Sequence, residues 1–202
     1  MPGLENTTAT LLLAAAIGYG LGSILFGLIV TRMMNLGDLR AIGSGNIGAT
    51  NVLRTGNKLA AALTLVLDGG KGAVAILLAR AMVGEDAAQI AALAAFLGHC
   101  FPIWRKFKGG KGVATFIGLW LALDWRVGLA CCATWLVAAV ATRMSSMGAL
   151  VAVVASTVWI VMFTDGSAFF LGVFLTIVVF LCHHENIARI RSGTEPKIGQ
   201  KS

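Results

Sequence analysis

The sequence predicts an all-α integral membrane protein with seven transmembrane helices, some of them short. Of its 202 residues, 57% are hydrophobic and only 12% are charged, and the mean hydropathy is +0.84. That charged share is about half of what a soluble domain carries. Uncharged apolar stretches recur along the whole chain, and the basic residues gather in alternate connections between them. A chain of this length is expected to form a single domain, residues 1–202.

Seven apolar stretches account for the predicted helices. They cover about residues 7–31, 59–79, 87–104, 112–123, 127–142, 147–163 and 168–182. A helix needs roughly 20 residues to cross ~30 Å of hydrocarbon. The stretch at 112–123 is shorter than that, so the loop before it, residues 108–111, is expected to dip toward the bilayer.

The basic residues predict that the N-terminus lies outside the cell and the C-terminus in the cytoplasm. The first ten residues contain Glu5 and no Lys or Arg, unlike a signal peptide, so we expect the first stretch to remain as a span. With alternating loops, the outside connections contain only Arg80 and Arg126. The other Lys and Arg residues outside the spans, up to Lys201, fall in the cytoplasmic connections 32–58, 105–111, 143–146 and 183–202. Such an excess is the positive-inside pattern.

The composition also excludes some classes of partner. The net charge is +7, but the basic residues are grouped by position along the chain and lack the interleaved exposed aromatic residues of a single-strand binder, so no nucleic acid is expected. The four cysteines lie at or in apolar stretches without C-x-x-C spacing, which is typical of small buried hydrophobic residues.

The first cytoplasmic loop is rich in glycine and short polar residues, with the sequence GSGNIGATNV at residues 43–52. Backbone N–H groups of such a loop can converge on an anion. Its G-x-G-x-x-G spacing is a weak dinucleotide signal because no βαβ unit surrounds it. A tight turn between two helices is the plain alternative. We take Ser44, Asn46 and Arg54 as the candidate binding residues of this loop.

The motif Gly-Gly-Lys-Gly occurs twice, at residues 69–72 and 109–112. The second copy opens a span, where free N–H groups and the helix dipole favour a phosphate. Gly109, Gly110, Lys111 and Gly112 are therefore candidate phosphate-binding residues. The alternative is a basic loop whose lysines face lipid headgroups.

Three polar residues lie within or at the end of apolar stretches. Asp68 and Lys71 are three apart and can pair on one helix face. Charges at membrane depth usually face a polar interior, so they form either a structural ion pair or a substrate-facing Lys71 held by Asp68. His99 is either a polar link between helices or a capping residue.

Polar residues also follow the last span. His183 can act as a general acid or base or bind a phosphate, and Asn186 lies on the same helix face. A metal site built from His183, His184 and Glu185 is disfavoured, because adjacent helical residues point about 100° apart and no further ligand is evident. We expect neither a metal nor a cofactor.

Ser145 and Ser146 form a short cytoplasmic turn and either cap the next helix or face the same pocket as the other loops. All these polar clusters fall on the predicted cytoplasmic side. A basic pocket there suits an anionic lipid precursor and a soluble phosphate co-substrate.

Four motifs, in this order along the chain, carry a resemblance to a known family. They are GSGNIGATN at 43–51, GHCFP at 98–102, KFKGGKGVAT at 106–115 and HHENIAR at 183–189. They resemble the motifs of the acyl-phosphate:glycerol-3-phosphate acyltransferase family, PlsY, and the likeness extends to length, span count and motif order. One departure is DGGKG at 68–72, where the family usually has bulkier residues between Asp and Lys.

The resemblance implies a multi-pass enzyme of the bacterial inner membrane with its active site on the cytoplasmic side. The 1-hydroxyl of glycerol 3-phosphate would attack the carbonyl of a long-chain acyl phosphate, giving lysophosphatidic acid and phosphate without acyl-CoA. This reaction would open phospholipid synthesis. The expected partners are thus acyl phosphate, glycerol 3-phosphate and the lipid bilayer.

The resemblance also implies residue roles. Lys111, the glycine N–H groups around it and Ser44 would hold the acyl phosphate and its departing charge. Direct attack is favoured over an acylated Ser44, because an acyl phosphate already has a good leaving group. The proton would pass to His183 or to a substrate phosphate oxygen. The glycerol phosphate would be held by Arg54, Lys71, Asn186 and His183, with Asn46, Ser145 and Ser146 nearby.

Two other functions remain open from the residues alone. Seven spans with basic loops also suit a phosphate or anion transporter, although a transporter should have polar residues or broken helices near the midplane. A lipid-binding scaffold would explain the basic face but not the glycine-rich loops.

Overall fold

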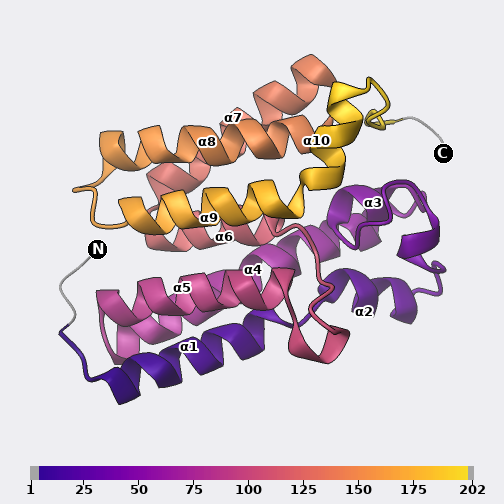
Figure 1. Ribbon diagram of the computed structural model, residues 1–202. Coiled ribbons are helices and arrows are strands. Elements are labelled where there is room, and N and C mark those ends of the chain that lie inside the picture. The colour runs from indigo at the N-terminus through magenta and orange to yellow at the C-terminus, as the bar shows by residue number, and fades with distance from the viewer. Residues whose placement is uncertain (1–4, 200–202) are drawn as a thin grey trace.

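The computed structural model describes residues 5–199, which form helices and no strands (Figure 1). The expectations for residues 1–4 and for Lys201 lie outside that range. The elements are α1 (Thr8–Gly22), α2 (Phe26–Met33), η1 (Leu39–Ala41), α3 (Ala49–Leu53), α4 (Lys58–Met82), α5 (Glu85–Cys100), η2 (Ile103–Arg105), α6 (Val113–Leu123), α7 (Trp125–Thr142), α8 (Ser145–Phe163), α9 (Phe169–Cys182) and α10 (His184–Arg191).

Each predicted apolar stretch coincides with a helix or a helix pair, which confirms the all-α membrane fold class. Within the described residues, five helical segments are long and apolar enough to cross a membrane, the first being α1 and α2 together. A sixth is α9 with α10, which are bent by 63° at their junction. Helix α6, which corresponds to the short stretch at 112–123, has only 11 residues, or about 16 Å at 1.5 Å per residue. The count of seven spans and the orientation of the termini stay predictions.

Close helix contacts rely on small residues, as is usual between membrane helices. A Cβ atom added to Gly22 of α1 would lie 2.0 Å from the carbonyl oxygen of Ala95 in α5. Likewise, a Cβ atom on Gly118 of α6 would lie 2.2 Å from the carbonyl oxygen of Gly69 in α4. Helix α4 remains continuous through the Gly69-Gly70 pair. Of the two glycines that depart from the family pattern, Gly69 thus lies where α6 crosses α4 closely, whereas a Cβ atom on Gly70 would meet nothing within 4 Å.

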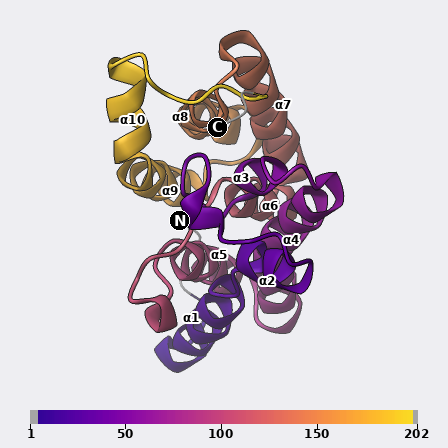
Figure 2. The same ribbon diagram turned by 90° about the vertical axis from the view of Figure 1, so that its right-hand side faces the viewer.

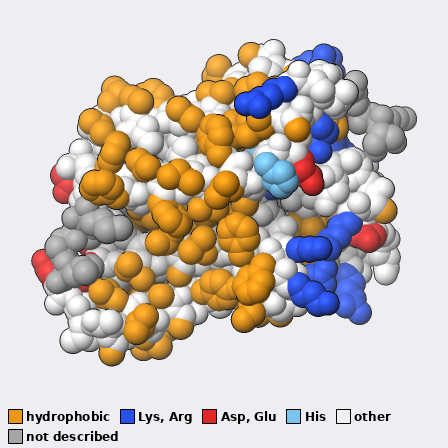
Figure 3. Space-filling model, viewed as in Figure 1, with side chains coloured by type: hydrophobic (Ala, Val, Ile, Leu, Met, Phe, Trp, Pro, Cys, Tyr) orange, Lys and Arg blue, Asp and Glu red, His pale blue; other side chains and the backbone are white. Residues whose placement is uncertain are grey.

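The outer surface has two zones. Large apolar side chains cover the body of the bundle, with Leu12, Val66 and Val137 among the most exposed. Lys and Arg side chains gather at the end that holds α2, α3 and α10 (Figure 3). An apolar belt of this extent is typical of a lipid-facing surface.

The α4–α6 crossing gives the first prediction. We expect Gly118→Ala to destabilise the protein by about 1–3 kcal/mol, because overpacking forces the helices apart. Thermal unfolding of purified protein in detergent measures the effect. Gly20→Ala is the matched control, since its added Cβ would meet nothing within 4 Å. Equal melting temperatures for the two variants would contradict the close crossing.

Candidate active site

A cavity of about 660 Å³ opens between the loops at the basic end and helices α4, α6 and α7. Figure 2 looks onto this end of the molecule. The loop after η1, the start of α6, the start of α8 and the α9–α10 junction give it a polar end. Leu65, Ile117, Leu121 and Trp135 line it further along the helices, where it is apolar. One continuous space therefore joins a polar site to an apolar groove.

The glycine-rich loop is organised around the buried side chain of Asn51. Its amide nitrogen donates to the carbonyls of Leu39 (2.8 Å) and Asn46 (2.7 Å). Its amide oxygen accepts from the backbone N–H of Ser44 (3.2 Å) and from the guanidinium of Arg54 (3.2 Å). The three predicted residues of this loop therefore line the cavity together. We had not predicted a site role for Asn51, and only its place within the motif pointed to it.

A second polar network joins the lysine of the phosphate loop to the C-terminal tail. Lys111 Nζ donates to Asn186 Oδ1, and Asn186 Nδ2 donates to Glu195 Oε1 (2.6 Å). Ser146 Oγ also donates to Glu195 Oε1 (2.6 Å), and Arg189 Nε donates to Glu195 Oε2 (2.8 Å). The side chain of Glu195 is only 5% exposed. Sequence reasoning missed this carboxylate, because a single Glu in a tail carries no distinctive pattern.

The surroundings of this network lower the pKa values of both Lys111 and Glu195. Burial lowers the pKa of Lys111, and the charge of Arg189 lowers it further, while Glu185 and Glu195 oppose this. Burial by itself would raise the pKa of Glu195, but hydrogen bonds from three side chains and the charge of Arg189 lower it overall. Glu195 is therefore a carboxylate that offsets the positive charge around it.

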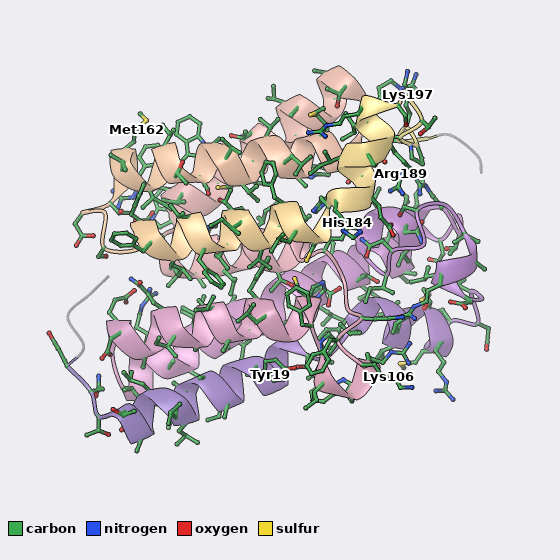
Figure 4. The ribbon with its side chains drawn as sticks, in the orientation of Figure 1. Tyr19, Lys106, Met162, His184, Arg189 and Lys197 are labelled. Atoms are coloured by element: carbon green, nitrogen blue, oxygen red, sulfur yellow. The ribbon has the colours of Figure 1, made fainter. Side chains whose placement is uncertain are left out.

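His183 lies buried at the junction of α9 and α10 and lines the cavity. Its Nδ1 atom is 2.8 Å from the carbonyl oxygen of Val179. A carbonyl only accepts hydrogen bonds, so we infer that Nδ1 carries the proton and that Nε2 of the neutral ring has a free lone pair. His184 instead lies on the exposed side of the junction (Figure 4). Of the two histidines, only His183 is suited to act as a base within the cavity.

The phosphate loop differs from the sequence prediction at two glycines. The N–H of Gly109 donates to the carbonyl of Cys100 (3.0 Å), and that of Gly110 donates to the carbonyl of His99 (3.1 Å). Neither glycine is among the described residues that line the cavity. These two N–H groups tie the loop to the end of α5 and are not free for a ligand.

The ligand-facing part of the loop begins one residue later. Lys111, Gly112, Val113 and Ala114 line the cavity. Gly112 has a φ of +78°, which favours glycine, and is the residue before the first turn of α6. The first N–H groups of a helix have no partner within it. The part of the Gly-Gly-Lys-Gly motif that faces the cavity is thus Lys111 and Gly112 at the start of α6, and not the two leading glycines.

Lys71 lies beneath the cavity and is not part of its lining. Its ammonium group donates to the carbonyl of Ile24 (2.6 Å) and to Asp68 Oδ1 (2.8 Å), and it lies 2.7 Å from His99 Nδ1. Two of its hydrogen bonds therefore go to Ile24 and Asp68, and His99 lies within hydrogen-bond distance as a third partner. This corrects our expectation that Lys71 contacts substrate: it links α4 to α5 below the phosphate loop.

The serine turn lines the cavity as well. Ser145 Oγ lies 3.1 Å from Thr50 Oγ1, and Ser146 bonds to Glu195 as described. Each serine therefore ties the start of α8 to a different side of the site. In all, nine predicted site residues line the cavity: Ser44, Asn46, Arg54, Lys111, Gly112, Ser145, Ser146, His183 and Asn186.

Comparison with known proteins identifies the family of this chain. The family model described as glycerol-3-phosphate acyltransferase matches residues 12–193. A glycerol-3-phosphate acyltransferase from Ruegeria pomeroyi is 69% identical over 202 residues, covering 100% of both chains. One from Roseobacter denitrificans is 62% identical over 198 residues, covering 98% of this chain and 99% of the relative.

Solved structures give the same result. The glycerol 3-phosphate form of PlsY (YgiH), an integral membrane glycerol 3-phosphate acyltransferase, has a TM-score of 0.87 and 34% identity, covering 94% of this chain and 96% of that chain. Its lysophosphatidic acid form has a TM-score of 0.85 and 33% identity, covering 94% and 95%. The resemblance noted in the sequence is confirmed. The chain belongs to the glycerol-3-phosphate acyltransferase family, as a multi-pass integral membrane enzyme.

Proposed function

We propose that this protein transfers the acyl group of a long-chain acyl phosphate to the 1-hydroxyl of glycerol 3-phosphate. The observation that carries the proposal is the single cavity, about 660 Å³ in volume, that joins a basic polar end to an apolar groove. The similar crystal structures are a glycerol 3-phosphate form and a lysophosphatidic acid form of the relative. A phosphorylated headgroup and an acyl chain are the two parts that such a cavity suits.

The polar end offers two groups of phosphate ligands. Lys111, the free N–H groups at the start of α6 and Ser44 are proposed to hold the acyl phosphate. Arg54, Asn186 and His183 are proposed to hold glycerol 3-phosphate. Ser145, Ser146 and Asn46 complete the lining around them.

The apolar groove suits the acyl chain. Its lining residues Leu65 and Val66 on α4 are 52% and 68% exposed, and Leu121 on α6 is 42% exposed. These side chains belong to the lipid-facing surface of the bundle. The groove therefore gives a lipid substrate a route from the bilayer to the polar end.

The chemistry needs positioning and charge stabilisation more than a protein nucleophile. The glycerol hydroxyl oxygen bonds to the acyl carbon, and the bond from that carbon to the phosphate oxygen breaks. Lys111 and the dipole of α6 stabilise the charge on the departing phosphate. The hydroxyl proton passes to Nε2 of His183 or to a phosphate oxygen. Holding both substrates close together in one cavity lowers the entropic part of the activation barrier.

We further propose that the cavity opens to the cytoplasmic side of the bacterial inner membrane, where the reaction begins phospholipid synthesis. The support is the concentration of Lys and Arg side chains around the cavity end (Figure 3), which is typical of cytoplasmic loops. A cytoplasmic opening gives access to the soluble substrate.

Removal of the lysine charge tests the phosphate site. We expect Lys111→Ala to lower kcat with palmitoyl phosphate by at least about two orders of magnitude, because one preorganised charge at a developing anion is worth that much. Phosphate release from purified protein measures the rate. The melting temperature in detergent checks the fold. Near-normal turnover in the folded variant would overturn the assignment.

Arg54 tests the assignment of the second substrate. We expect Arg54→Ala to raise the KM for glycerol 3-phosphate by at least about ten-fold, since one charge-assisted hydrogen bond is worth about 1.5–3 kcal/mol. The KM for palmitoyl phosphate should change much less. Steady-state kinetics with each substrate varied in turn give both values. The opposite pattern would mean that the two phosphate positions are exchanged.

The pH dependence follows from the pKa of Lys111. Because that pKa lies below the ordinary value of 10.5, the ammonium loses its proton at a lower pH than an ordinary lysine. We expect kcat/KM for acyl phosphate to fall on the alkaline side with a midpoint below 10.5. A pH profile corrected for spontaneous hydrolysis measures this. The same fall in the residual activity of Lys111→Ala would contradict the assignment.

A further inference from the structure

Residues 101–108, here named the 101–108 lobe, project from the bundle where α5 ends (Figures 1 and 2). Every side chain from Ile103 to Lys108 is exposed. Three of them are large and apolar: Ile103 is 60% exposed, Trp104 57% and Phe107 59%. None of these three is needed to line the cavity. The lobe therefore exposes large apolar side chains that are not part of the cavity lining.

Hydrogen bonds and a ring contact with α1 hold the 101–108 lobe in a defined conformation. The hydroxyl of Tyr19 on α1 donates to the carbonyl of Phe101 (2.7 Å) and accepts from the N–H of Ile103 (2.9 Å). The ring of Tyr19 also meets that of Trp104 edge-on, with centroids 6.4 Å apart. Figure 4 shows Tyr19 on one side of the lobe and Lys106 on the other. These contacts fix the outward direction of Trp104.

Its backbone conformation is also unusual. Lys106 and Phe107 have φ values of 52° and 61°, in the left-handed region that bulky residues rarely adopt. The N–H of Phe107 donates to the carbonyl of Pro102 (3.0 Å), and that of Lys108 donates to the carbonyl of Arg105 (3.1 Å). Strained conformations of this kind cluster at functional sites.

Positive charge surrounds the exposed apolar side chains. The lobe contains Arg105, Lys106 and Lys108, and it has no Asp or Glu. Arg40 adds a fourth cation, because its guanidinium donates to the carbonyl of Lys108 (3.3 Å). Trp and Tyr combined with Lys and Arg are typical of the membrane–water interface, where the rings sit at headgroup level and the cations meet lipid phosphates.

We propose that the 101–108 lobe binds the headgroups of anionic phospholipids at the edge of the bilayer. Trp104 and Phe107 would enter the boundary of the acyl chains, and Arg105 and Lys106 would contact the lipid phosphates. The chain runs directly from the lobe into Gly109 and the phosphate loop. A bound headgroup would therefore steady the loop that carries Lys111. The binding claim rests on the membrane fold and does not require acyl transfer.

Site-selective quenching tests this proposal without any turnover. Nanodiscs are made with equal amounts of phosphatidylcholine and phosphatidylglycerol, and only one of the two is brominated. The fluorescence difference between the native protein and Trp104→Phe isolates Trp104 from the other four tryptophans. A basic residue beside an anionic surface gains about five-fold in binding. We expect brominated phosphatidylglycerol to quench Trp104 several-fold more than brominated phosphatidylcholine does.

Two charge variants complete the test. In Arg105→Gln/Lys106→Gln the two lipids should quench Trp104 about equally. Arg32→Gln/Arg191→Gln removes the same charge from exposed positions on α2 and α10 and should keep the preference. Equal quenching by both lipids in the native protein would overturn the proposal. Absence of quenching by either lipid would also overturn it and would point to a lobe in water, open to a soluble protein partner.

Discussion

The central constraint on this structure is that helix α6 begins inside the protein, where its first backbone N–H groups need hydrogen-bond acceptors. Helix α6 has only 11 residues, and the residues at its start line the cavity within the bundle. Unpaired backbone groups at such depth are costly unless protein or a water-filled cavity satisfies them. The carbonyls of His99 and Cys100 satisfy the N–H groups of the two residues that lead into the loop. The remaining N–H groups at the start of α6 face the cavity, where they can donate hydrogen bonds to an anion. The short helix thus brings a phosphate site next to an apolar groove.

Charged side chains near the start of this helix lie in two hydrogen-bonded networks. Lys71 and Asp68 form an ion pair with side chains only 2% exposed, and His99 joins it below the phosphate loop. Above the loop, Lys111 is linked through Asn186 to Glu195. Breaking a buried pair leaves an uncompensated charge, which is strongly destabilising. The two networks therefore hold the loop from both sides and keep a positive charge available for a phosphate.

The sequence predicted the all-α membrane fold well, because long apolar stretches and the grouping of basic residues between them can be read from local sequence. Predicted residues that belong to motifs, such as Ser44, Lys111 and Asn186, do line one cavity. The prediction of site residues failed where the hydrogen-bond partners of a side chain come from distant segments of the chain. Glu195 is an ordinary residue until the tail folds back against α8 and α10. Conversely, Lys71 resembles a binding residue in the sequence, but in the fold its ammonium group contacts the carbonyl of Ile24 and the side chain of His99.

The central claim is that an acyl phosphate is the donor, and one assay tests it most directly. Purified protein in detergent receives glycerol 3-phosphate with either palmitoyl phosphate or palmitoyl-CoA, and phosphate release and lysophosphatidic acid are followed together. A cavity with a phosphate site at the start of α6 predicts equal amounts of both products from palmitoyl phosphate and none from palmitoyl-CoA. Product from palmitoyl-CoA alone, or from neither donor while the protein keeps its melting transition, would contradict it.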